Sequence, residues 1–165
     1  MSLVVEDGSG LAGAESYCSV AAANARHTAL GNAAWTGADA VKEAALRRAT
    51  QYMLQTYRNR WNGTRITQAQ ALDWPRWGVI VDTRYYVLSN SVPADVANAC
   101  ADLALKAITE DLSPDLDRAV IRERVGPLET EYNPYSPQAK RFTAINAMLA
   151  PYLKGSSAMA EVVRA

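Results

Sequence analysis

Four arginines alternate with aromatic residues in the middle of the chain, between residues 57 and 77. The arginines are Arg58, Arg60, Arg65 and Arg76, and the aromatic residues are Tyr57, Trp61, Trp74 and Trp77. Because a guanidinium pairs with phosphates and a flat ring stacks on an unpaired base, this pattern is typical of proteins that bind single-stranded DNA. The candidate contacts are Arg58, Arg60, Trp61, Arg65 and Trp77. The alternative is that the tryptophans anchor a long irregular loop, with the arginines stacked on them or paired with carboxylates.

Other residue types that do chemistry are too few or too scattered to form an active site. His27 is the only histidine, and we expect it on the exposed side of a helix, which leaves a Ser-His-Asp arrangement without its base. Glu129 and Glu131 have the spacing of one strand face, where we expect them to point to solvent. Cys18 and Cys100 form no CxxC pair, and the apolar stripe around Cys100 predicts a buried small side chain. We therefore predict no enzyme, with no catalytic residues, no cofactor and no metal.

The overall composition favours a helical protein and argues against a strongly basic DNA-binding protein. The chain has 165 residues, of which 17 are Lys or Arg and 17 are Asp or Glu, so its formal net charge is zero. Thirty alanines and a single phenylalanine favour helices that pack closely through small side chains. No apolar run approaches the ~18 residues of a membrane span, and the acidic start of the chain is unlike a secretion signal. We expect a cytoplasmic protein with reduced thiols and no membrane contact.

The hydrophobic periodicity predicts a mainly α fold, a small bundle of three to four helices with one or two short β-strands and extended terminal arms. We expect helices at about 19–30, 39–57, 93–112 and 142–153, and a strand signal at 125–132. Residues 79–81 and 85–87 are either two short strands or apolar anchors of the loop. A long central loop spans about 58–92, because Asn-Gly, Trp-Pro and single glycines interrupt it. The predicted division of the chain is an N-terminal arm, residues 1–15, a helical domain, residues 16–153, and a C-terminal tail, residues 154–165.

Charge is unevenly distributed along the second half of the chain. Residues 91–132 contain four basic and nine acidic residues, whereas residues 133–165 contain four basic residues and one acidic residue. In a self-assembling protein, such asymmetry can match an acidic face of one copy to a basic surface of the next. The candidate subunit contacts are Lys140, Arg141 and Lys154.

A series of short segments, in order along residues 4–155, resembles one family of phage and prophage proteins. The segments are Val5-Glu6-Asp7-Gly8, Ser16-Tyr17, Asn32-Ala33-Ala34-Trp35, Lys42-Glu43-Ala44-Ala45-Leu46-Arg47-Arg48-Ala49-Thr50, Trp61-Asn62-Gly63-Thr64-Arg65, Gln70-Ala71-Leu72-Asp73-Trp74-Pro75-Arg76, Val92-Pro93, Leu103-Ala104-Leu105 and Val125-Gly126-Pro127-Leu128. The family is similar to the small helical head–tail adaptor (connector) proteins of tailed phages. Some of its members are labelled DnaT-like single-stranded DNA-binding protein.

The two parts of this resemblance imply different functions. The adaptor part implies a structural virion protein in the virion neck, present in the host cytoplasm before assembly. It would form a homo-oligomeric ring, usually of twelve copies, between the portal protein and head-closure or tail-completion proteins, and genomic DNA would pass through its lumen without sequence-specific binding. The DNA-binding label implies a replication accessory protein instead.

We favour the adaptor at this point, for two physical reasons. Zero net charge suits a channel wall along which DNA slides, because tight binding needs many phosphate contacts. Alanine-rich helices and terminal arms suit a head-to-tail interface between identical copies that closes into a ring. In this interpretation the tail, residues 154–165, engages the portal.

Overall fold

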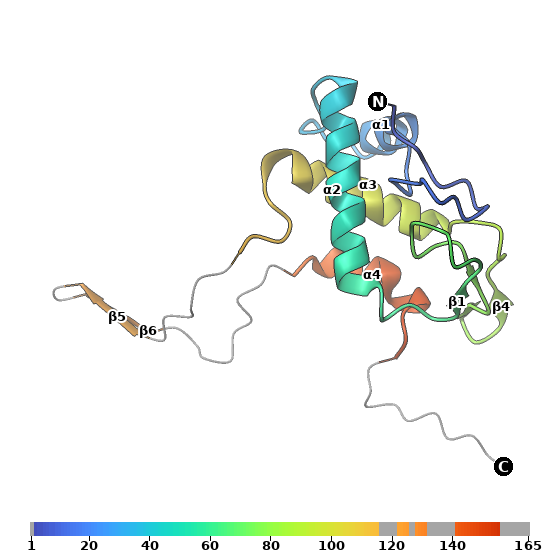
Figure 1. The fold of residues 1–165 in the computed structure, drawn as a ribbon. Coiled ribbons are helices and arrows are strands. Elements are labelled where there is room, and N and C mark those ends of the chain that lie inside the picture. The colour runs from blue at the N-terminus through green and yellow to red at the C-terminus, as the bar shows by residue number, and fades with distance from the viewer. Residues whose placement is uncertain (1, 116–121, 126–127, 132–140, 156–165) are drawn as a thin grey trace, which may run out of the picture.

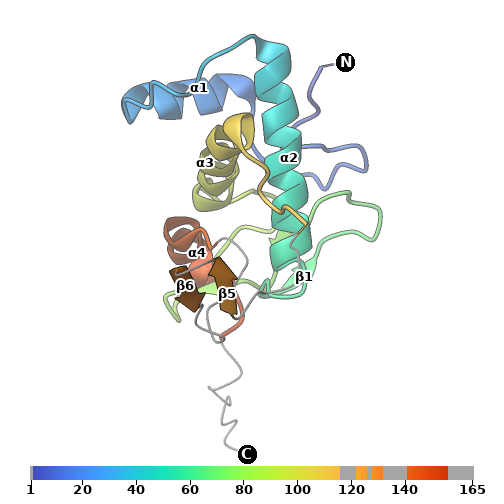
Figure 2. The same ribbon diagram turned by 90° about the vertical axis from the view of Figure 1, so that its left-hand side faces the viewer.

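Two long helices, α2 (Asp39–Tyr57) and α3 (Ala94–Thr109), pack against each other at the centre of the molecule (Figure 1). The computed structural model describes residues 2–115, 122–125, 128–131 and 141–155. Figure 2 shows that α1, α3 and α4 all lie along one side of α2. The other helices are α1 (Val20–Ala29), α4 (Thr143–Leu149) and the short 3-10 helix η1 (Ala150–Tyr152). The predicted mainly helical fold is confirmed.

The strands form three separate two-stranded antiparallel sheets. The three pairs are β1 (Thr64–Arg65) with β2 (Arg76–Trp77), β3 (Ile80–Val81) with β4 (Tyr85–Tyr86), and β5 (Arg122–Val125) with β6 (Leu128–Glu131). The described part of the chain thus has more strands than the one or two predicted. Strands do form within 79–81, 85–87 and 125–132, whereas β1 and β2 were not predicted and β5 begins before the expected segment. In the described part of the chain, no helix is both long and apolar enough to cross a membrane.

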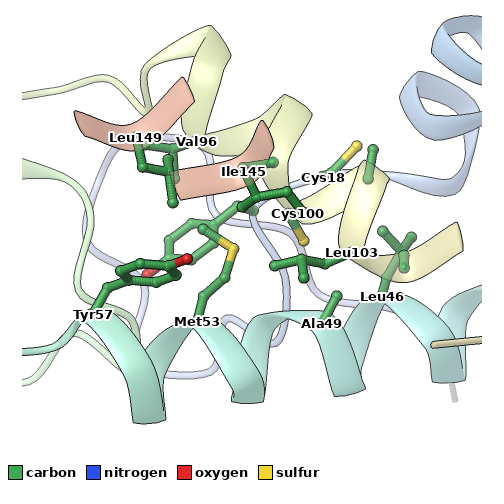
Figure 3. Close-up of a cluster of buried hydrophobic side chains, with 14 of the residues drawn as sticks. Cys18, Leu46, Ala49, Met53, Tyr57, Val96, Cys100, Leu103, Ile145 and Leu149 are labelled. Carbon is green, nitrogen blue, oxygen red and sulfur yellow. The ribbon is translucent and has the colours of Figure 1, made fainter. Parts of the chain in front are cut away.

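The core forms where small side chains let α2 approach α3, and α4 packs against α3. Apolar residues recur along α2 every three or four positions, so they occupy one face of the helix. Figure 3 shows these side chains pointing toward α3 and α4, with Ala49 opposite larger residues. The labelled residues are Leu46, Ala49, Met53 and Tyr57 of α2, Val96, Cys100 and Leu103 of α3, Ile145 and Leu149 of α4, and Cys18, which precedes α1. Cys100 is fully buried, as the sequence predicted. The core therefore depends on small residues at defined positions.

Helix α1 has the predicted ends, but its histidine does not lie where we expected. Ser19 caps the helix by accepting a hydrogen bond from the backbone N–H of Ala22, at 3.1 Å. The prediction that His27 is exposed is wrong, because this residue is only 1% exposed. Its Nε2 lies 3.0 Å from the carbonyl oxygen of Ala101, and its ring centroid lies 4.7 Å from that of Trp35. The close approach of α1 to α3 buries the ring, which the sequence of α1 alone does not reveal.

The N-terminal segment is attached to the body and is not the extended arm that we predicted. Val5 pairs with Ser16 in an isolated parallel bridge. The carboxylate of Glu6 is buried and accepts backbone N–H groups from Gly8, Gly10 and Leu11, at 3.0, 2.8 and 2.9 Å. This turn brings the carbonyl of Leu11 to the N–H of Ala71, at 3.1 Å. One buried carboxylate thus orders a segment that is poor in core residues.

Substitution of Ala49 by leucine tests the packing of α2. Ala49 is fully buried against α3, so three added heavy atoms have no space and should lower the free energy of unfolding by about 1–3 kcal/mol. Ala44 is exposed on the same helix, and Ala44→Leu is the control, expected to change stability by less than about 0.5 kcal/mol. Urea denaturation measures both, and equal effects would contradict the packing described here.

The buried His27 predicts a loss of stability in mild acid. Burial lowers the pKa of its imidazole below the ordinary value, so the unfolded chain takes up a proton that the folded chain does not. Stability should therefore be constant above pH ~7 and fall as the pH drops below about 6.5, the pKa of an unfolded histidine.

The measurement is the free energy of unfolding between pH 8 and 5, compared with a His27→Gln variant that lacks the titrating group. The variant should not show this fall. Because His27 is the only histidine, its pKa can be read directly from the imidazole NMR signals. A measured value at or above 6.5 would contradict the prediction.

Candidate nucleic-acid interface

The central loop is held at one end of α2 by a buried group of aromatic rings. Trp61 and Trp74 are 1% and 0% exposed, and their ring centroids are 5.7 Å apart in an edge-on arrangement. Tyr57 contacts Trp61, and Tyr152 contacts Trp74, also with centroids 5.7 Å apart. The expectation that tryptophans anchor the loop is therefore confirmed for this pair. Trp61, a candidate DNA contact from the sequence, has no exposed ring face on which a base could stack.

Trp77 belongs to a second, exposed group of apolar side chains on the hairpins β1–β2 and β3–β4. Trp77 is 69% exposed, Tyr85 62% and Tyr86 74%. The register pairs Ile80 with Tyr86, so these two side chains share one face of the second hairpin. We call the exposed residues Trp77, Ile80, Tyr85, Tyr86 and Leu88 together the aromatic surface; Tyr85 leaves the face of the hairpin opposite to that of Ile80 and Tyr86. Large exposed rings gathered on one segment mark an interaction site in a folded protein.

The sequence analysis missed the two tyrosines. Tyr85 and Tyr86 were predicted to be strand residues or apolar anchors, and they do form β4. Both are exposed, because no other described element packs on this hairpin except η1, which contacts β3. The available signal was their position beside Arg84, whose guanidinium lies 5.9 Å from the ring of Tyr85.

The three candidate arginines are exposed, but each is anchored differently. Arg58 donates from Nε to Oδ1 of Asp73 at 3.1 Å, and half of its side chain remains exposed. The guanidinium of Arg60 lies 5.5 Å from the ring of Tyr57. Arg65 donates from Nη1 to the carbonyl of Gln70 at 3.2 Å. These contacts hold the cations in place while leaving donor groups for a ligand.

Local charge differs from the charge of the whole chain. Residues 58–92 contain five arginines and two aspartates, although the chain as a whole is neutral. The argument from net charge therefore overlooked a segment of positive charge. Because the attraction between a protein charge and a phosphate falls off within ~8–10 Å at physiological salt, a DNA strand bound here would respond to the net charge of this segment and not to that of the whole chain.

Arg76 is buried and holds the backbone of the central loop in place. It is only 7% exposed and donates to three backbone carbonyls, those of Asn62 at 2.7 Å, Gly63 at 2.6 Å and Asp73 at 3.1 Å. Gly63 has a φ of +65°, and a Cβ at this position would collide with the carbonyl oxygen of Trp77. The backbone of β1 therefore passes close to β2. A pocket of about 390 Å³ opens between Arg58, Arg65 and Arg76.

The remaining candidate residues are only partly covered by the structure. Arg141 and Lys154 are exposed, and Lys140 lies outside the described residues. The backbone N–H of Lys154 donates to the carbonyl of Arg60 at 2.7 Å, which places this lysine beside the central loop. The structure therefore does not test the predicted role of these three residues as subunit contacts.

The two thiols are buried and remain protonated. Burial raises the pKa of Cys18 to about 12, and it also raises the pKa of Cys100. A protonated thiol is a poor nucleophile and a poor metal ligand. Among the residues that the structure describes, no group of three or more His, Cys, Asp or Glu side chains is placed to hold a metal ion.

The full chain, residues 1–165, matches the model of a family described as "Putative DnaT-like ssDNA binding protein". The chain belongs to this family. No curated protein and no solved structure matches it.

Membership of this DnaT-like family changes which part of the resemblance we favour. The part that named DnaT-like proteins agrees with the family match. Nothing in the comparisons supports the adaptor part, which we favoured from composition. The DnaT-like description concerns single-stranded DNA. The aromatic surface and the exposed arginines Arg58, Arg60 and Arg65 are the part of the molecule most relevant to that description.

Proposed function

We propose that the protein binds single-stranded DNA through the hairpins β1–β2 and β3–β4. The observation that supports this most directly is the exposure of three aromatic rings, those of Trp77, Tyr85 and Tyr86, on a segment with five arginines. Stacking of a base on such a ring contributes about 1–3 kcal/mol, and every base has a face that can stack. The full-length match to the DnaT-like family agrees with this assignment.

The arrangement favours binding that depends little on base sequence. The exposed rings offer flat surfaces, and Arg58, Arg60 and Arg65 offer donors for phosphates. Both kinds of contact are common to all sequences. Because the segment 58–92 has five arginines against two aspartates, and so only a small excess of positive charge, we expect moderate affinity that weakens as salt increases. This behaviour suits a replication accessory protein that binds transiently exposed single strands.

Removal of one exposed ring should weaken DNA binding without affecting the fold. Trp77→Ala should lower the affinity for a fluorescent oligothymidylate by about 5- to 100-fold, because one stacking contact is lost. Tyr86→Ala should act in the same direction. Leu30, 56% exposed at the end of α1, supplies the control variant Leu30→Ala, which should bind like the unaltered protein.

The salt dependence provides a second measure of the same interaction. Arg60→Ala should weaken binding and reduce the slope of log affinity against log salt by about 0.7, the value for one phosphate contact on a single strand. Arg48, exposed on α2 away from the hairpins, serves as the matched control. Unchanged affinity in the Trp77 and Arg60 variants would contradict the proposed surface.

A second candidate function is self-assembly as a phage head–tail adaptor, and the hairpin β5–β6 favours it. Its four residue pairs run from Arg122 with Glu131 to Val125 with Leu128. Among the described residues it contacts no other helix or strand, and Figure 1 shows it standing away from the helices. A two-stranded hairpin is marginally stable alone in water. In this candidate function a neighbouring copy in a ring packs against it, and portal and head-closure proteins contact the ring in the virion neck.

Mass measurement separates the two candidate functions. For the adaptor, light scattering should show a ring-sized particle whose population grows with protein concentration, and replacing residues 122–131 by a short Gly-Ser linker should reduce it to the monomer. Thermal unfolding of the helical body should not change in that variant. Charge reversal at Arg141 and Lys154 should weaken the same assembly. A chain that stays monomeric at all concentrations, alone and with portal protein, would exclude the ring.

A further inference from the structure

The pocket between the residues that follow α2 and the strands β1 and β2 has walls in which positive charge exceeds negative charge. We call it the arginine pocket; it measures about 390 Å³, and its lining residues are Arg58, Asn59, Gly63, Thr64, Arg65, Asp73 and Arg76. Three guanidinium groups therefore face one carboxylate. Such a concave site, where charged groups converge, is a candidate ligand site.

Two of these arginines are paired only with neutral groups. Arg76 is more than nine-tenths buried, and its three hydrogen bonds go to backbone carbonyls. Arg65 also donates to a carbonyl, that of Gln70. In the described part of the chain neither forms an ion pair with a carboxylate. Burial lowers the pKa of Arg76, and the nearby Asp73 offsets this only in part.

Other partly buried arginines of the same protein are compensated. Arg26 donates two hydrogen bonds to the carboxylate of Asp102, both at 2.8 Å. Arg47 pairs with Glu15 at 2.9 Å and with Glu43 at 3.5 Å. Since burying a cation without a counter-charge is costly, the arginine pocket stands out as the place where an anion would supply the missing partner.

The polar groups around the pocket suit an anion with several oxygen atoms. The side chains of Asn59 and Thr64 line it, and neither has a hydrogen-bond partner among the described residues. Asp73, 2% exposed, uses Oδ1 to accept from Arg58, while its Oδ2 has no partner among these residues. A phosphate presents oxygens in a geometry that guanidinium forks and small polar donors match.

We propose that the arginine pocket binds one phosphate group of a DNA strand that lies across the aromatic surface. This inference rests on the proposed function. Arg76 and Trp77 are neighbours on β2, so their side chains leave opposite faces of the strand. Arg65 is the cross-strand partner of Arg76 and shares its face. The pocket and the ring of Trp77 therefore lie on opposite faces of the hairpin, so a DNA strand that reaches both passes around its edge and contacts them with different nucleotides. Two sources supply the phosphate: an internal phosphodiester or a terminal phosphate.

Inorganic phosphate is the first probe, titrated into the full-length protein at constant ionic strength and followed by calorimetry and by arginine Nε–H NMR signals. Arg65→Ala should weaken its binding at least about fivefold, because one charged donor is lost. Asp73→Asn should tighten it by about threefold or more, because the competing negative charge is removed while Oδ1 still accepts from Arg58. Arg48→Ala should have no effect. Opposite signs in the Arg65 and Asp73 variants cannot arise from a general loss of structure.

Oligothymidylates then identify the source of the phosphate. A 5′-phosphorylated strand that binds more tightly than its 5′-hydroxyl counterpart, with the difference lost in Arg65→Ala, supports a terminal phosphate. Equal binding of the two strands, with weaker binding of a methylphosphonate backbone, supports an internal phosphodiester.

The outcomes also separate this inference from the proposed function. Phosphate binding that is absent, or unchanged in Arg65→Ala, overturns the pocket assignment, while loss of DNA binding in Trp77→Ala would still uphold the proposed function. Phosphate binding with the expected variant effects, but no binding of any oligonucleotide, overturns both the proposed function and the assignment to DNA.

Discussion

The structure of the candidate interface depends on the contacts among four buried rings, those of Tyr57, Trp61, Trp74 and Tyr152. They join the end of α2, two points of the central loop and the C-terminal helix η1. A loop with strands of only two residues cannot fix its own conformation by backbone pairing. The rings provide the missing constraint, and the carbonyl contacts of Arg76 complete it. The exposed side chains of the hairpins are therefore held on a rigid support of buried rings, which limits the conformational entropy lost on binding.

The uneven distribution of charged residues explains how a neutral protein can present a positive surface. Acidic residues gather elsewhere, in residues 91–132, whereas the loop carries five arginines. The loop has two aspartates, Asp73 and Asp82. Asp73 is buried and accepts a hydrogen bond from Arg58. Its position keeps Arg58 ordered and reduces the positive charge of the pocket. The surface therefore combines hydrogen-bond donors held in place with a reduced positive potential, which suits contacts that form and dissociate quickly.

The helices could be predicted from the sequence, and most of the interface could not. Apolar residues at helical spacing placed α1, α2 and α3 within a few residues, because this signal is local. The burial of His27 and the order of the N-terminal segment depend on contacts between segments far apart in the chain. Trp61 and Trp77 show the limit most clearly. Both are tryptophans that directly follow an arginine in one loop, yet one is 1% and the other 69% exposed.

The backbone pairing of residues 60–62 with residues 152–154 joins the start of the central loop to the segment at the end of η1. The N–H of Lys154 meets the carbonyl of Arg60, and the side-chain amide of Asn62 donates to the carbonyl of Leu153 at 3.1 Å. The chain thus leaves its last helix directly beside the arginines. A truncation that removes residues 152–154 would therefore release the central loop as well as shorten the chain.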